Sequence, residues 1–240
     1  MEITTLAERP GLEHALLELS GEWPGFTGHE PVTQSRWAEI PQVFPEFVLV
    51  ATEGRELVAR GFSVPFRSRG ALPGTGWDQV MIWAFRDHAA EMKTDTVSAI
   101  EITIRGGRRG TGLSGRMLEA MRANAKAHGF SELVAPVRPN AKHLEPKASM
   151  AEYAFRTRED GLPHDPWLRV HIRAGGVIDS IAPASMVVAG SLDQWRDWTD
   201  LPFDLSGPVE VPGALVPVTC SLEHDQAVYV EPNVWVRHSL

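Results

Sequence analysis

The residues best suited to chemistry in this 240-residue chain lie in a loop rich in glycine and arginine. Residues 105–116 contain the glycines Gly106, Gly107, Gly110, Gly112 and Gly115 and the arginines Arg105, Arg108, Arg109 and Arg116. Glycine lets the backbone approach a ligand closely, and arginine forms charge-assisted hydrogen bonds suited to phosphate. A turn that binds nothing is the alternative, but it would not need so many of either residue. The loop therefore predicts a site for a phosphate-bearing ligand.

The elements on either side of this loop are expected to be a strand and a helix. Residues 97–104 are mostly β-branched and apolar, which is typical of a buried strand. Residues 116–129 carry an apolar stripe with a helical period and end at Gly129, a favoured residue just past a helix. Free N–H groups at the start of such a helix point toward negative charge, which strengthens the prediction of an anion site.

The glycine spacing alone leaves the ligand open. Gly110, Gly112 and Gly115 match the pattern of dinucleotide-binding loops, so a nicotinamide-dependent oxidoreductase is one alternative. That reading also requires repeated βαβ units and an acidic residue about 20 positions on. The next expected strand, residues 130–137, is instead followed by Arg138, which weakens the dinucleotide reading. No Lys-Ser or Lys-Thr pair closes the loop as in nucleoside-triphosphate sites.

A closer match is the acetyl-CoA-binding motif of the GNAT N-acetyltransferases, which the chain resembles most clearly over residues 97–140. The family motif is a strand, a short loop, Gln/Arg-x-x-Gly-x-Gly/Ala and a helix; Ser114 stands where Gly or Ala is usual. The resemblance implies that acetyl-CoA is the co-substrate and that no metal takes part. The cofactor residues that it implies are Ile102, Thr103 and Ile104 of the strand, Arg109, Gly110, Thr111, Gly112, Leu113, Ser114 and Gly115 of the loop and helix start, and Asn140 after the next strand.

The same resemblance implies an α/β (α+β) fold with a mixed, mostly antiparallel sheet, a central parallel pair of strands that splay apart, and flanking helices. A hairpin signal at residues 52–55 places two antiparallel strands before residues 97–104. Pro136 lacks an N–H, which suits a strand beside a gap. We expect residues 1–190 to form the acyl-CoA-binding core, with a helical insertion near 77–91. Residues 191–240 would be a C-terminal extension that completes the sheet, and we expect both parts to form one domain.

Two residues are candidates for catalysis. A helix beginning at Asp165 resembles the fourth helix of the family and puts His171 where a tyrosine commonly protonates the leaving thiolate. Glu101, a carboxylate inside an apolar strand, is the candidate base for the acceptor amine. Each has an ordinary alternative: His171 as a structural histidine, and Glu101 in a buried ion pair with an arginine. A chain of waters could also replace a side-chain base.

Composition narrows the partners and the compartment. The net charge of −8 does not favour nucleic acid, and Cys220 is the single cysteine, so no internal disulfide is expected. The first residues lack the features of a signal peptide and no long apolar run occurs, so we expect a soluble cytoplasmic protein without a membrane segment. Trp195, Trp198 and Trp235 are expected in a core more than in an acceptor site. The family also implies a homodimer.

The function that these patterns predict is an acetyl-CoA-dependent N-acetyltransferase that transfers the acetyl group directly to the amine of a small molecule. The identity of the acceptor does not follow from the sequence. The main alternative is a protein of the same fold that binds acyl-CoA without acetyl transfer, as a sensor or with a longer acyl chain.

Overall fold

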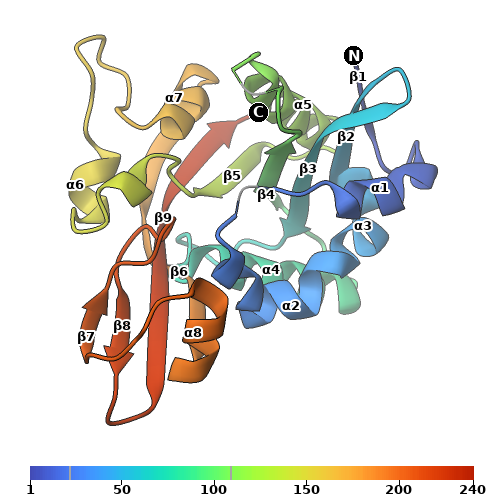
Figure 1. The fold of residues 1–240 in the computed structure, drawn as a ribbon. Helices are drawn as coiled ribbons and strands as arrows, with labels where there is room; N and C mark the ends of the chain where they lie inside the picture. Colours follow the sequence, from blue (N-terminus) through green and yellow to red (C-terminus); the bar gives the residue numbers. More distant parts are fainter. Residues whose placement is uncertain (22, 109) are drawn as a thin grey trace.

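The computed structural model describes residues 1–21, 23–108 and 110–240, and in this part of the chain a nine-stranded sheet is the central element (Figure 1). Its order is β1-β2-β3-β4-β5-β9-β8-β7, with β6 paired to β9 beside this path. The strands are β1 (Glu2–Thr5), β2 (Val48–Glu53), β3 (Glu56–Phe66), β4 (Thr96–Ile104), β5 (Glu132–Val137), β6 (Val177–Gly190), β7 (Gly207–Val209), β8 (Val218–Ser221) and β9 (Gln226–Ser239).

The helical segments are of two types, α-helices and short 3-10 turns. The α-helices are α1 (Glu13–Glu18), α2 (Pro31–Arg36), α3 (Ile40–Val43), α4 (Gly76–Ala89), α5 (Leu113–Ala127), α6 (Met150–Ala154), α7 (Pro166–Arg173) and α8 (Leu192–Thr199). Short 3-10 turns are η1 (Pro10–Leu12), η2 (Gly25–His29), η3 (Trp37–Glu39), η4 (Pro45–Phe47) and η5 (Lys142–Leu144). Within the described ranges, no helix combines the length and the apolar character needed to cross a lipid bilayer.

The sheet has the mixed, mostly antiparallel character that the sequence predicted. β2 and β3 form the expected hairpin, and Gly54 in its turn has a φ of 61°, a conformation that glycine adopts without strain. β3 continues antiparallel to β4, and β4 runs parallel to β5. The predicted fold class is thus confirmed.

The central strands separate after a very short stretch of pairing. β4 and β5 pair only at Val97 with Leu133 and at Ser98 with Val134. Just beyond, the register between β3 and β4 shifts so that Ile100 has no partner, and such a bulge bends a strand. The predicted splay is confirmed, and the bulge that accompanies it is a feature that the sequence did not reveal.

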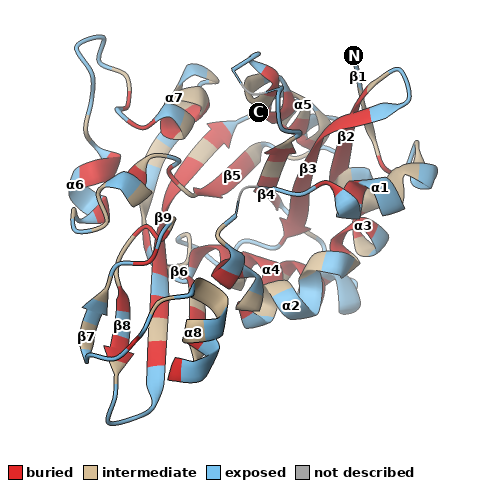
Figure 2. Ribbon diagram, in the orientation of Figure 1, coloured by how far each residue is buried: buried red, intermediate tan, exposed pale blue. Residues whose placement is uncertain are grey.

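Two apolar layers cover the two faces of this sheet. α5 packs on one face, and Gly61 of β3 allows its close approach, since a Cβ at that position would lie 2.8 Å from Met121 Cε. α1, α3 and α4 bury their apolar side chains on the other face. Figure 2 accordingly shows the central strands buried and the outer faces of the helices exposed. The sheet thus has a covered centre, and the cleft opens within it where β4 and β5 part.

The C-terminal part adds a third apolar cluster around β7, β8, α8 and the first half of β9 (Figure 1). Trp195 is fully buried there, and Trp235 is fully buried in the main core, as expected for core residues. Phe26 of η2 packs against this cluster, with its ring centroid 5.5 Å from that of Trp195 and 5.1 Å from that of Tyr229. The cluster therefore fixes the N-terminal segment around η2.

Two segments differ from what their local sequence predicts. The sequence of residues 33–43 predicts one helix, but the segment is broken into α2, η3 and α3, because prolines start α2 and interrupt backbone donation at Pro41. Residues 185–189 predict a short strand, but they are the second half of β6, which begins at Val177 and changes register twice against β9. The boundary expected near residue 190 coincides with the end of β6, but the division into core and extension stays a prediction.

One carboxyl group lies in an unusual environment between α4 and its neighbours. Burial, together with the charges of Glu30 and Glu231, raises the pKa of Asp78 to about 8, although a hydrogen bond from the backbone of Val187 opposes this shift. Its Oδ1 is buried and has no hydrogen-bond partner among the described residues. The folded protein therefore holds a proton that the unfolded chain releases at much lower pH.

We expect this proton to make stability fall as pH rises. The folded pKa lies above the unfolded value of 3.8, so the native state binds more protons between about pH 4 and 8, and the free energy of unfolding decreases across that window. Asp78→Asn removes this dependence. Its melting temperature relative to wild type should rise by at least about 3 °C from pH 5 to 8, since one pKa unit is ~1.4 kcal/mol. Asp193→Asn, on the exposed part of α8, is the control. Parallel melting curves for wild type and Asp78→Asn would contradict the assignment.

Candidate active site

A cavity of about 650 Å³ opens where β4 and β5 diverge. It brings together most of the residues that the sequence singled out. Those that line it are Glu101, Ile102, Thr103, Ile104, Gly110, Leu113, Ser114, Asn140 and His171. Thr111, Gly112 and Gly115 are not part of its lining, although they belong to the same loop and helix start. Arg109 lies outside the described residues. The cofactor assignments themselves stay predictions.

The loop before α5 has the geometry of an anion site. Gly107, Gly110 and Gly112 all have φ between 73° and 80°, which side chains other than glycine rarely adopt. Gly112 is the N-cap of α5 and supplies no side-chain cap, so the first N–H groups of this 15-residue helix are free of capping by a side chain. Leu113 and Ser114 of this first turn line the cavity. The helix N-terminus thus faces the space in which a phosphate would lie.

The loop arginines are partly engaged by the protein itself. Arg105 Nε donates to the carbonyl oxygen of Leu57 at 2.8 Å, and Arg108 Nη2 lies 2.6 Å from Glu53 Oε2. Both side chains are nearly half exposed, so these contacts leave them accessible. The backbone, more than these two side chains, is the part of the loop that is already arranged for a ligand.

Glu101 sits in the buried ion pair that the sequence left as an alternative. Arg60 Nε lies 2.8 Å from Glu101 Oε2, and Arg60 Nη2 lies 3.2 Å from Oε1. Thr103 Oγ1 donates to the same carboxylate at 2.7 Å. Arg60 is itself held by the carbonyl oxygen of Leu16 and lies over the ring of Trp37. Glu101 still lines the cavity, so it combines a structural contact with access to a ligand, and its role as a base stays a prediction.

His171 is positioned by α7 and by a second histidine. Asp165 caps α7 as predicted, since its Oδ1 accepts from the N–H groups of Trp167 and Leu168. His171 Nδ1 lies 3.0 Å from Nε2 of His238 on β9. Burial and, to a smaller extent, the neighbouring His238 lower the pKa of His171 to about 3. His171 is therefore neutral at physiological pH, and Nε2 is the ring nitrogen left for the cavity.

The corresponding helix of the family commonly ends in Gly-Phe, whereas this chain has Gly175 and Gly176. A Cβ at Gly176 would lie 2.6 Å from His238 Cε1 and 2.8 Å from the carbonyl oxygen of His171. A larger residue is thus incompatible with the histidine pair. The sequence does not identify His238 as the partner of His171, because nothing local links two residues 67 positions apart.

Several cavity residues escaped the sequence analysis. Trp23, Trp77, Arg138 and Asn233 all line the cavity, and they come from the N-terminal segment, α4, the end of β5 and β9. A smaller cavity of about 310 Å³ adjoins the first, and residues such as Trp37 and Arg60 line it alone. The residues common to both cavities are Gly21, Trp23, Pro24, Trp77 and Glu101. No spacing pattern connects these positions, so only the fold brings them together.

The insertion near residues 77–91 serves two purposes. α4 buries Val80, Met81 and Ala84 in the core and so covers the sheet. Its first turn also contributes Trp77 to both cavities. The helix is therefore a cover for the sheet and a wall of the site.

Comparison with known proteins places this geometry in context. No family model matches the chain. The chain is 32% identical over 271 aligned residues to the arginine N-acetyltransferase avaD of Aspergillus versicolor, and the alignment covers 99% of this chain and 93% of the relative.

Solved structures give an independent comparison of the fold. The loading GNATL domain of CurA from Lyngbya majuscula matches with a TM-score of 0.63 and 16% identity, covering 99% of this chain and 96% of that one. The GphF GNAT-like decarboxylase in complex with isobutyryl-CoA matches with a TM-score of 0.56 and 15% identity, covering 100% and 99%. At such identities the likeness concerns the fold alone.

A charge placed at the N-cap of α5 tests the anion site. Gly112→Asp should weaken acetyl-CoA binding at least about 100-fold, because the carboxylate would repel phosphate at the helix N-terminus. Gly112→Asn is the matched control, since asparagine tolerates the left-handed conformation and adds no charge. Isothermal titration calorimetry should show a loss of less than about tenfold for this control. Micromolar affinity retained by Gly112→Asp would remove the loop from the site.

Proposed function

Since this chain belongs to the GNAT superfamily of N-acetyltransferases, we propose that it transfers the acetyl group of acetyl-CoA directly to the amine of a small molecule. The observation that carries the proposal is the cavity between the splayed strands. It joins the uncapped N-terminus of α5 at one end to Glu101 and His171 in the interior. A CoA molecule suits this arrangement, with its phosphates near the helix and its thioester near the side chains.

The chain's own residues can supply each step of acyl transfer. Bound acetyl-CoA supplies the activated acetyl group. An alkylammonium has a pKa near ~10, so the acceptor must lose a proton before attack, and Glu101 is the candidate to accept it directly or through a water. Beyond Ser98, the edge of β4 that faces β5 has no strand partner in the described part of the chain, so its backbone N–H groups are available to an oxyanion.

The last step is the protonation of the leaving thiolate as the C–S bond breaks. His171 is the candidate to guide that proton: burial keeps its imidazole neutral, so its Nε2–H can hydrogen-bond to the thiolate or to a bound water, and the proton that ends on sulfur is the one that the acceptor nitrogen loses. Its partner His238 occupies Nδ1 and so fixes the orientation of the ring. The imidazolium form of His171 would be the main form only below about pH 3.

The relative and the charge of the chain both support a proposal for the acceptor class. The relative is named for arginine, and the net charge of −8 here favours a cationic small molecule over an acidic peptide. The adjoining cavity, whose walls include Trp23, Trp37 and Trp77, offers room for the body of such a molecule. We propose a small amine as the acceptor.

Thermal unfolding with acetyl-CoA, CoA, NADH and NADPH in parallel tests the cofactor. A ligand that binds only the native state at 100 times its Kd adds ~2.7 kcal/mol, which raises the melting temperature by roughly 5 to 10 °C. We expect this rise with acetyl-CoA and CoA alone. Acetyl transfer is then tested with a panel of amines, by measuring the release of the CoA thiol. Binding without transfer or hydrolysis would favour the non-transferring alternative, and a rise with a nicotinamide nucleotide alone would overturn the proposal.

Substitution of the candidate acid separates chemistry from binding. His171→Phe should lower kcat about 100-fold, the usual contribution of a general acid, while the Kd for CoA changes less than about threefold. Since His171 is neutral above about pH 4, the wild-type kcat profile should contain no inflection from this residue between pH 5 and 9. CoA-dependent thermal stabilisation of the variant checks its fold. An unchanged kcat at every pH would exclude His171 from the mechanism.

A further inference from the structure

Arg138 is the first residue after β5 and lines the main cavity on the side opposite β4. Its side chain is 16% exposed. Glu101, on β4, lines the same cavity. The two strands that separate to form the cleft thus each bring one charged side chain to it, with opposite signs.

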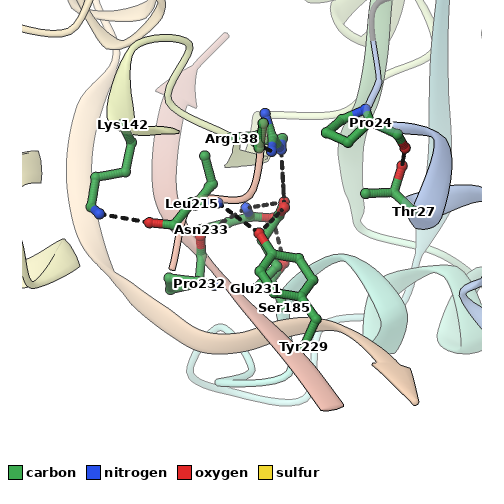
Figure 3. Close-up of polar contacts among 11 residues, drawn as sticks. Pro24, Thr27, Arg138, Lys142, Ser185, Leu215, Tyr229, Glu231, Pro232 and Asn233 are labelled. Atoms are coloured by element: carbon green, nitrogen blue, oxygen red, sulfur yellow. Dashed lines mark hydrogen bonds and ion pairs between the residues drawn. The ribbon is translucent and has the colours of Figure 1, made fainter. Parts of the chain in front are cut away.

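A fully buried carboxylate holds Arg138 in place. Arg138 Nε lies 3.1 Å and 3.0 Å from the two carboxylate oxygens of Glu231 on β9, and Arg138 Nη2 donates to the carbonyl oxygen of Gly213 at 2.6 Å. Figure 3 shows Tyr229 and Asn233 reaching the same carboxylate, at 2.8 Å and 3.1 Å. Glu231 is 0% exposed, so this anchor lies behind the cavity wall and not in it.

This anchoring leaves part of the guanidinium unused. A guanidinium carries five N–H donors, and Glu231 and Gly213 engage Nε and Nη2. Among the described residues, none accepts a hydrogen bond from Nη1. The guanidinium also lies over the ring of Trp23, 5.5 Å from its centroid, and Trp23 lines the cavity too. The planar group is thus rigid, charged and partly free at the wall of a cavity, which is how proteins present arginine to a carboxylate.

We propose that Arg138 binds the carboxylate of the acceptor, so that the acceptor is a free amino acid and not a simple amine. This inference rests on the proposed function and narrows its substrate class. A zwitterionic amino acid complements the cleft, with its carboxylate at Arg138 and an amino group toward Glu101. Its side chain would extend into the adjoining cavity of about 310 Å³, which begins at Glu101, Trp23 and Trp77.

A matched pair of substrates tests this reading. L-Arginine and L-argininamide differ only in the carboxylate, so a residue that reads the carboxylate should affect them unequally. Arg138→Gln should lower kcat/KM for L-arginine about 10- to 100-fold, mainly through KM, because a hydrogen bond to a charged group is lost. The value for L-argininamide should change less than about threefold. Arg138→Lys should restore part of the loss for L-arginine, since it keeps the charge without the planar fork.

Removal of Arg138 alone leaves Glu231 buried without its partner, which threatens the fold. The double variant Arg138→Gln/Glu231→Gln removes both charges and keeps similar volumes, and stabilisation by acetyl-CoA confirms that it is folded. Equal losses for the two substrates in a folded variant would make Arg138 a structural residue and overturn the proposal. Equal kcat/KM of the wild-type protein for the two substrates would overturn it as well.

Failure of the proposed function has a different signature. In that case neither substrate is acetylated, and calorimetry with the CoA-bound wild-type protein decides the question of the carboxylate. Tighter binding of L-arginine than of L-argininamide, lost in the double variant, would support the role of Arg138. Equal binding of both, or binding of neither, would overturn it.

Discussion

The separation of β4 and β5 after two paired residues is the constraint on which the rest of the molecule depends. Parallel strands inside a sheet normally satisfy each other's backbone groups, and burying those groups unpaired is costly. Here the bulge at Ile100 bends β4 away, while β9 holds the other edge of β5 over its whole length. The cleft is therefore fixed by hydrogen bonds on its outer sides. A polar ligand between the strands would satisfy the backbone groups that the sheet leaves open.

Two ion pairs hold the walls of this cleft. Arg60 with Glu101 ties β4 to β3 and, through the carbonyl oxygen of Leu16, to the N-terminal helix. Arg138 with Glu231 ties the end of β5 to β9 and to the loop at Gly213. A buried pair of charges gains little stability over apolar packing, but loss of one member is costly. The main effect of these pairs is therefore to restrict which residues the site tolerates, and their contribution to the stability of the fold is smaller. They also keep the interior of the cleft polar without a large net charge.

Sequence reasoning succeeded where a signal is local. The glycine loop, the hairpin around Gly54 and the cap at Asp165 each depend on residues a few positions apart, and the structure has all three. It failed where partners are distant: Arg60 lies 41 positions from Glu101, and Arg138 lies 93 positions from Glu231. An arginine at the end of a strand has no periodicity that would reveal its partner. The candidate cofactor loop could thus be predicted, whereas the acceptor side could not.

The histidine pair shows how one departure from the family pattern requires others. A neutral imidazole buried at position 171 has two ring nitrogens that need hydrogen-bond partners, whereas the phenol of a tyrosine has a single hydroxyl group. His238 supplies the partner for Nδ1, and its ring occupies space that a residue larger than glycine at position 176 would fill. The change at 171 is therefore compatible with the fold only together with Gly176 and His238. The absence of the family's phenylalanine at position 176 then has a physical reason, because these three positions form one packed unit.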